Sequence, residues 1–232
     1  MTEADWREGG PEEAAEIAAA AIGGGLRDRG AAIAALPGGK SPWPALERLS
    51  QMGMPSPGWP AVTLLPSDDR QVPKGDALSN AGPLTALFEP TSAQILELSD
   101  AGLSPEEAGA SASAKVAARA GGATLDLCWL GMGTDGHVAS IFPGPDYRTA
   151  LSTDALALGV RPDPLPPEAP VARVSLSARA ISRARTLMLT IAGEEKAAVL
   201  RRALEEGEKS SLPAGRVLAM AKTPPIIIWS PS

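Results

Sequence analysis

Residues 125–137 read LDLCWLGMGTDGH, and this stretch decides the fold class. The run Thr124–Leu130 is apolar on both faces apart from Asp126, which is typical of a strand buried inside a parallel sheet. It breaks off into a glycine-rich turn, where α/β proteins commonly bind ligands. Outward from this run, short apolar segments predict further strands at 31–36, 61–65, 94–98, 172–176, 186–192 and 225–229.

Helical patterns lie between these segments. Ser104 opens one with a capping box and a proline at its first position, and this helix is expected to continue to Ala120. Ser41 followed by Pro42 predicts another start, with Ser41 as N-cap residue. Further helices are expected at 11–28, from Ser79-Asn80 to Phe88, between the strands 172–176 and 186–192, and at 193–206.

Alternating strands and helices predict an α/β protein with three layers: a mostly parallel sheet with helices on both faces. The length of 232 residues suits one domain over residues 1–232. In such sheets ligands bind beyond the carboxyl ends of the strands. Here those ends carry glycines, carboxylates and the only histidine of the chain.

The composition excludes several classes of function. There are 21 basic and 27 acidic side chains, which give a net charge of −6 and argue against a nucleic-acid partner. One Cys and one His cannot form an internal disulfide or a Cys/His zinc site, so no metal is expected. Apolar runs stay below the roughly 18 to 20 residues of a membrane span. Acidic residues precede the Ala-rich N-terminal stretch, unlike a signal peptide. We therefore expect a cytoplasmic protein without a membrane partner.

The turn after the central strand formally matches a dinucleotide-binding motif. Gly131, Gly133 and Gly136 satisfy G-x-G-x-x-G, and Asp154 lies near the offset of a ribose-binding carboxylate. A pyrophosphate site needs a long helix that begins within the motif, and Pro143 follows too soon for one. The alternative is that the glycines let the backbone approach a ligand, with His137 as general base and Asp135 beside it. A structural role for His137 is the competing interpretation.

Three other loops carry candidate anion-binding residues. Gly38-Gly39-Lys40-Ser41 offers free backbone N–H groups and a hydroxyl before a helix, although it also suits a plain tight turn. In Asp68-Asp69-Arg70 the arginine can bind a phosphate with two hydrogen bonds, unless the segment is only a solvated turn. Lys196, near the start of a helix, is unfavourable for the helix dipole unless an anion lies beside it or glutamates pair with it.

Together these segments resemble a known family. The stretches LPGGKSPWPALERL (36–49), WPAVTLLPSDDRQVPKGDALSN (59–80), LDLCWLGMGTDGHVASIFPG (125–144), VARVSLSARAISRARTLMLTIAGEEKAAVLRRAL (171–204) and LPAGRVL (212–218) are similar to 6-phosphogluconolactonases. These belong to a superfamily with sugar-phosphate isomerases and glucosamine-6-phosphate deaminases. The resemblance implies their Rossmann-like fold and, in the oxidative pentose phosphate pathway, hydrolysis of 6-phosphoglucono-1,5-lactone to 6-phosphogluconate. No cofactor is expected, and the implied state is a monomer or weak homodimer.

The resemblance also implies roles for individual residues. His137 is the base that activates water, Asp135 orients it, and Asp68 belongs to the same catalytic group. The substrate and its phosphate are held by Gly38, Gly39, Lys40, Ser41, Arg70, Arg173 and Lys196. Two positions depart from the family pattern: Asp69 stands where Glu is usual, and Lys40 stands where a small residue is common.

Two alternatives stay open on the sequence. A glucosamine-6-phosphate deaminase has a glutamate five residues after the motif histidine, and this chain has Phe142 there. A non-catalytic sugar-phosphate sensor normally follows a DNA-binding helix-turn-helix, and only about ten residues precede the first expected helix. The lactonase interpretation accounts for all four loops.

Overall fold

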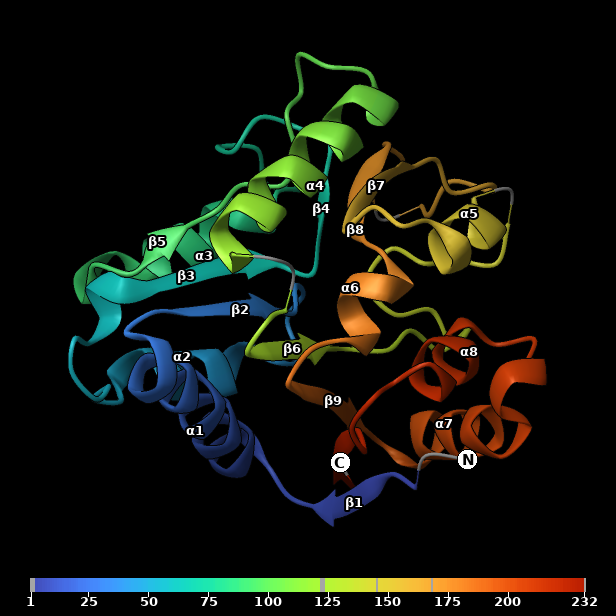
Figure 1. The fold of residues 1–232 in the computed structure, drawn as a ribbon. Coiled ribbons are helices and arrows are strands. Elements are labelled where there is room, and N and C mark those ends of the chain that lie inside the picture. Colours follow the sequence, from blue (N-terminus) through green and yellow to red (C-terminus); the bar gives the residue numbers. More distant parts are fainter. Residues whose placement is uncertain (1–2, 122–123, 145, 168, 232) are drawn as a thin grey trace.

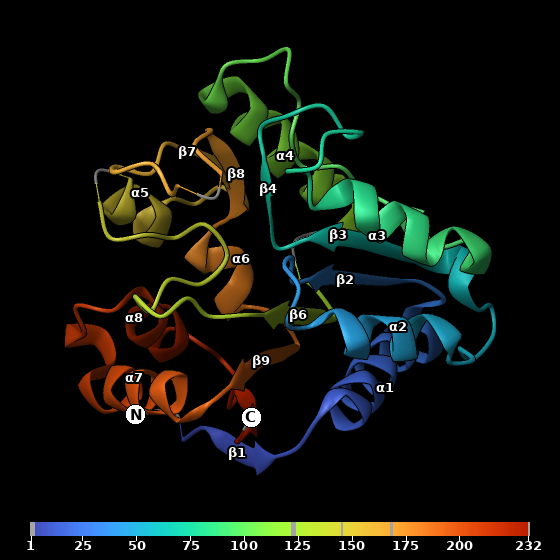
Figure 2. The same cartoon turned by 180° about the vertical axis from the view of Figure 1, so that it is seen from behind.

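The computed structural model describes residues 3–121, 124–144, 146–167 and 169–231, and its main feature is a parallel sheet (Figures 1 and 2). Within the described residues the sheet has seven strands in the order β1-β10-β9-β6-β2-β3-β5, and every adjacent pair is parallel. The strands are β1 (Asp5–Glu8), β2 (Ala32–Leu36), β3 (Val62–Pro66), β5 (Gln94–Ile95), β6 (Leu127–Leu130), β9 (Thr186–Ala192) and β10 (Ile226–Ser230).

Helices cover both faces of this sheet, as the sequence predicted. Alternate side chains of β2 point to opposite faces: Ala34 packs in one core and Ala35 in the other. One core contains α1 (Pro11–Arg29), α2 (Trp43–Gln51) and α3 (Ala81–Phe88). The other contains α4 (Pro105–Ala120), α5 (Tyr147–Ser152), α6 (Ala178–Ser182), α7 (Glu194–Glu206) and α8 (Pro213–Ala219). The predicted three-layer α/β architecture is therefore confirmed.

A second, smaller sheet departs from the prediction. It consists of β4 (Asp68–Arg70), β8 (Arg173–Leu176) and β7 (Ala157–Val160) in the order β4-β8-β7, with antiparallel pairing throughout. The strand expected at 172–176 exists as β8, but it pairs in this small sheet and not in the main one. Sequence reasoning did not predict β4 or β7 as strands.

Several predicted boundaries also need correction. Ser41 is not an N-cap: α2 begins at Trp43, and Pro42 precedes it without a capping side chain. The strand expected at 94–98 is only Gln94–Ile95. β1 was not predicted because its exposed, charged side chains give no strand pattern, and it is held by backbone pairing with β10. The capping box at Ser104 is confirmed, since Ser104 and Glu107 each bind the other's backbone N–H.

The strand order places a crevice at the middle of the sheet. The chain runs outward from β2 to β3 and β5 on one side, and from β6 to β9 and β10 on the other. The order therefore reverses between β2 and β6, and loops that leave the carboxyl ends of two such strands diverge to opposite faces. The glycine-rich segments after these two strands lie at this point.

Candidate active site

A cavity of about 290 Å³ lies at the carboxyl edge of the sheet, where the strand order reverses. Nine of the ten predicted site residues line it. The tenth, Asp135, is not among the lining residues, but its carboxylate contacts the His137 ring. The lining residues come from β4, β8 and β9, from the loops after β2, β3 and β6, from the residue before α3 and from the first turn of α7. The lining residues are Pro37, Gly38, Gly39, Lys40, Ser41, Pro42, Ser67, Asp68, Arg70, Asn80, Gly131, Met132, Gly133, His137, Ala139, Arg173, Thr190 and Lys196.

The histidine–aspartate pair is tightly arranged. His137 Nδ1 lies 2.6 Å from Asp135 Oδ1, and the backbone N–H of His137 donates to the same oxygen at 3.2 Å. The hydrogen bond from His137 is the main cause that holds the pKa of Asp135 below its ordinary value. An ionised Asp135 accepts a proton-bearing Nδ1, which leaves Nε2 of the imidazole as the nitrogen that can take a proton.

Glycines make this arrangement sterically possible. A Cβ at Gly133 would overlap the Cε1 and Nδ1 atoms of the His137 ring. Gly136 has a φ of 78°, a left-handed conformation that suits glycine. The G-x-G-x-x-G pattern in this chain therefore accommodates the imidazole. Among the described residues, the first helix after β6 is α5, which begins at Tyr147, whereas a dinucleotide site has a helix that begins within the motif.

Asn80 connects three parts of the site and was not recognised from the sequence as a site residue. Its Oδ1 accepts from Arg70 Nη1 at 2.5 Å, and its Nδ2 donates to the backbone oxygen of Asp68 at 2.8 Å. The side chain also packs so closely on Gly38 that a Cβ there would lie 2.5 Å from it. The sequence marks Asn80 only as part of the expected start of a helix, because its site contacts are with residues distant in the chain.

The carboxylate of Asp69 caps the start of α3, the helix that the sequence expected from Ser79-Asn80. Asp69 accepts the backbone N–H groups of Asn80 at 2.6 Å and Ala81 at 3.3 Å, at the start of α3. The Ser79 hydroxyl accepts from Gly82 at 3.1 Å. Burial raises the pKa of Asp69, with these N–H groups opposing the shift. Asp69 does not line the cavity, so its departure from the family pattern lies away from the ligand space.

Asp68 is the one carboxylate among the described residues that line the cavity. It is 7% exposed, and its Oδ2 accepts from the Ser140 hydroxyl at 2.5 Å. Ser140 is fully buried, and its backbone N–H donates to Ser175 Oγ at 3.1 Å. The turn that follows His137 is thereby fastened to both β4 and β8.

Four basic side chains line the same cavity: Lys40, Arg70, Arg173 and Lys196. Arg70 and Arg173 are directly opposite each other in the antiparallel pair β4–β8. Like charges in such a pair are unfavourable unless an anion compensates them. Lys196 stands in the first turn of α7, where the helix dipole also favours a negative charge. The cavity therefore brings one imidazole and four basic side chains together on a chain of net charge −6.

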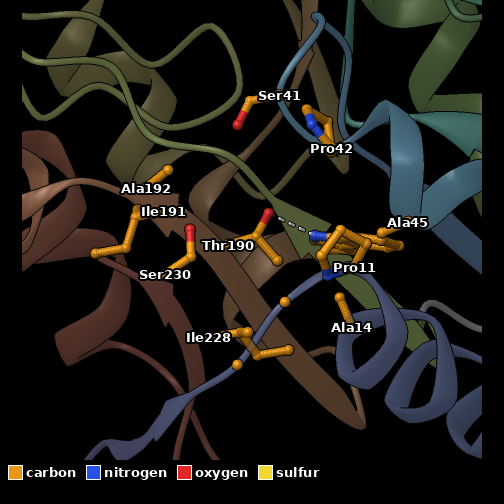
Figure 3. Close-up of a pocket in the computed structure, with 13 residues that line it drawn as sticks. Pro11, Ala14, Ser41, Pro42, Ala45, Thr190, Ile191, Ala192, Ile228 and Ser230 are labelled. Carbon is orange, nitrogen blue, oxygen red and sulfur yellow. Dashed lines mark hydrogen bonds between the residues drawn. The ribbon is translucent and has the colours of Figure 1, made fainter. Parts of the chain in front are cut away.

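A second cavity, of about 230 Å³, adjoins the first and shares Ser41, Pro42 and Thr190 with it. Figure 3 shows its lining from the start of α1, the start of α2 and the ends of β9 and β10. Trp129 Nε1 donates to Thr190 Oγ1 at 3.0 Å. None of the described residues that line this second cavity is charged. Of the two adjoining cavities, only the first is therefore lined by acidic and basic side chains.

Thiol chemistry needs a reactive cysteine, and a metal site needs clustered ligand side chains. Cys128 is buried in β6, and burial raises the pKa of its thiol, which disfavours the nucleophilic thiolate. Among the described residues no three His, Cys, Asp or Glu side chains gather as metal ligands. In the same residues there is no helix both long and apolar enough to span a bilayer.

The fold and the site together define an α/β protein with a histidine–aspartate pair and four basic side chains at the switch point of a parallel sheet. The chain belongs to the family described as glucosamine-6-phosphate isomerases/6-phosphogluconolactonase, whose model matches residues 7–226. A 6-phosphogluconolactonase of Caulobacter vibrioides is 32% identical over 94% of this chain and 92% of its own length. One from Neisseria meningitidis serogroup A is 34% identical over 88% of this chain and 87% of its own.

The solved structures agree with the sequence relatives. The crystal structure of a 6-phosphogluconolactonase from Shewanella baltica superposes with a TM-score of 0.83 at 27% identity, covering 99% of this chain and 98% of the other. A 6-phosphogluconolactonase from Thermotoga maritima superposes with a TM-score of 0.78 at 25% identity, covering 99% of both chains. Within the family, the chain thus groups with the 6-phosphogluconolactonases.

Proposed function

We propose that this protein hydrolyses 6-phosphoglucono-1,5-lactone to 6-phosphogluconate, with His137 as the base that activates water. The observation that carries the proposal is the His137–Asp135 pair at 2.6 Å beside a cavity lined by four basic side chains. Relatives over nearly the whole chain bear the name of this activity. The deaminase alternative lacks a comparable observation, because Phe142 packs against His137 where that reaction would use a glutamate.

Each group has a role in the proposed reaction. His137 Nε2 takes a proton from water as the water oxygen attacks the lactone carbonyl carbon, and the ring C–O bond then breaks. Asp135 holds the imidazole in the required tautomer and stabilises the imidazolium that forms. The proton passes from His137 to the leaving alkoxide, which becomes a hydroxyl group of the open-chain acid.

The phosphate lies remote from the reacting carbon, and its binding orients that carbon toward the water. Arg70, Arg173 and Lys196 provide charge for it, and Gly38, Gly39 and Ser41 provide backbone and hydroxyl groups. Lys40 adds a further cation at the exposed rim of the same loop. Asp68 is placed to accept a hydrogen bond from a sugar hydroxyl while Ser140 keeps its carboxylate in position.

Freshly prepared lactone offered to the purified protein tests the proposal, with spontaneous hydrolysis subtracted. We expect hydrolysis well above background, and a His137→Ala variant that loses roughly 100-fold or more in kcat while it still binds 6-phosphogluconate. Glucosamine 6-phosphate serves as the second substrate, and no ammonia release is expected from it. A rate equal to background would refute the function, and full activity of His137→Ala would refute the base assignment.

A further inference from the structure

The aromatic ring of Phe142 lies against the imidazole of the proposed base. The two ring centroids are 4.2 Å apart with an angle of 35° between the planes, within the range of a stacked contact. Phe142 is half-buried, and it does not itself line the cavity. It therefore contacts His137 from outside the ligand space.

A tight turn at residues 138–141 reverses the chain direction, so that the Phe142 ring packs against the His137 ring. The backbone N–H of Ile141 donates to the oxygen of Val138 at 2.9 Å, and Val138 also pairs with Met132 at the start of the glycine-rich turn. Ala139, inside the turn, has a φ of 49°, a left-handed conformation that is unfavourable for a residue with a Cβ. Ser140 fastens the turn through its buried bonds to Asp68 and Ser175.

Phe142 also contacts a cation of the proposed phosphate wall. The Cζ atom of Arg173 lies over the ring, 5.1 Å from its centroid. Arg173 is 3% exposed, and a guanidinium with little access to water gains more from an aromatic face than an exposed one does. One ring therefore contacts both the base and an anion-binding side chain.

The other contacts of the imidazole lie at its Nδ1 and Cε1 edge and leave its face to Phe142. The bond from Nδ1 to Asp135 fixes one nitrogen, and rotation about that bond still changes the direction of Nε2. Gly133 limits the ring along its Cε1 and Nδ1 edge. A flat neighbour against the ring face restricts the remaining tilt, which sets where Nε2 meets the water.

We propose that Phe142 is a positioning residue that holds the His137 imidazole and the Arg173 guanidinium in their working orientations. This inference rests on the proposed lactonase function for its kinetic consequence, although the ring contact itself can be tested without substrate. A substitution at Phe88 provides the matched control for loss of a phenylalanine ring. Phe88 is the only other phenylalanine, and it packs in the opposite core against Trp59, with ring centroids 5.5 Å apart.

The kinetic test compares Phe142→Leu, Phe142→Tyr and Phe88→Leu. A misplaced reacting group costs roughly 10- to 100-fold, so we expect Phe142→Leu to lower kcat by that factor and to raise KM through Arg173. Phe142→Tyr keeps the ring and should retain most of the activity. Phe88→Leu should lower the unfolding temperature and leave kcat and KM unchanged. Equal kcat and KM in Phe142→Leu and wild type, or a tyrosine variant as impaired as the leucine variant, would overturn the proposal.

The structural test uses NMR on the protein without ligand, where a single histidine gives one set of imidazole signals. Wild type should show Overhauser contacts between the Phe142 ring and the His137 ring, with the proton on Nδ1. Phe142→Leu should shift the imidazole signals while the proton stays on Nδ1, and Phe88→Leu should not shift them. Absence of the contact in wild type overturns the inference even if Phe142→Leu does not fold. An inactive wild type with the contact present would instead refute the proposed function alone.

Discussion

At the scale of single residues, Gly133 shows how closely the backbone fits the His137 imidazole. Any side chain at this position would overlap the His137 ring, whereas a Cβ at Gly53 meets nothing within 4 Å. We expect Gly133→Ala to displace the imidazole and lower kcat roughly 100-fold, with cooperative unfolding retained. Gly53→Ala is the control and should keep wild-type kinetics. Steady-state hydrolysis with both variants decides the matter, and a fully active Gly133→Ala would show that the imidazole has more room than the structure gives it.

The basic residues of the cavity lead to a second prediction at this scale. Arg70→Ala and Lys196→Ala should each weaken binding of 6-phosphogluconate roughly 10-fold, because a hydrogen bond between charged groups is lost. Arg48 is an exposed arginine that pairs with Glu12 at the surface, and Arg48→Ala should bind the product as wild type does. Calorimetric titration measures all three. Unchanged affinity in both cavity variants would remove these residues from the phosphate site.

At the scale of elements, α1 contains three consecutive glycines, and the second and third of them have opposite expected effects on stability. A Cβ at Gly24 meets nothing within 4 Å, so Gly24→Ala should stabilise the protein by about 0.5–1 kcal/mol through the lower backbone entropy of the unfolded chain. A Cβ at Gly25 would lie 2.6 Å from Asp126 Oδ2. Asp126 is buried, accepts from Ile33 N at 3.0 Å and pairs with Arg29.

Gly25→Ala should therefore destabilise the protein by about 2 kcal/mol, because the buried carboxylate loses its partners when it moves. Urea unfolding of the two variants beside wild type provides the measurement. If both substitutions shift the midpoint in the same direction, the helix does not pack on Asp126 as described. This contact also accounts for Asp126, the single charged residue in the mostly apolar run 124–130.

The elements also show how far local patterns reach. The Ser104 capping box was predicted correctly because a cap depends on adjacent residues. The Ser41 cap was wrong, since Pro42 and Pro44 allow the helix to begin later at Trp43. β4 was read as a polar turn, because only its antiparallel partner β8, over a hundred residues away, makes it a strand.

At the scale of the whole molecule, the small sheet depends on a close contact with α4. A Cβ at Gly159 in β7 would overlap the backbone oxygen of Pro105, and a Cβ at Gly109 in α4 would overlap the backbone of Gly159. Gly159→Ala should destabilise the protein by about 3 kcal/mol, because backbone atoms cannot yield as a side chain does. The same sheet carries Asp68, Arg70 and Arg173, so product affinity should fall as well.

Urea unfolding and product titration of Gly159→Ala check both parts of this prediction. A stability within about 0.5 kcal/mol of wild type, the usual range for a neutral surface change, would contradict it. Retained affinity together with lower stability would instead show that the small sheet keeps its position when α4 moves. The expectation of one domain over residues 1–232, and that of a monomer or weak homodimer, stay predictions.

The sequence by itself determined the α/β class, the order of most elements and the loops that gather at the carboxyl edge. These follow from hydrophobic periodicity and from glycine and proline positions, which act over a few residues. Only the tertiary structure showed that Asn80 bonds to Arg70, that Ser140 bonds to Asp68 and that the Phe142 ring contacts Arg173. Such contacts join segments far apart in the chain, and a local pattern contains no information about which distant backbone will pack beside it.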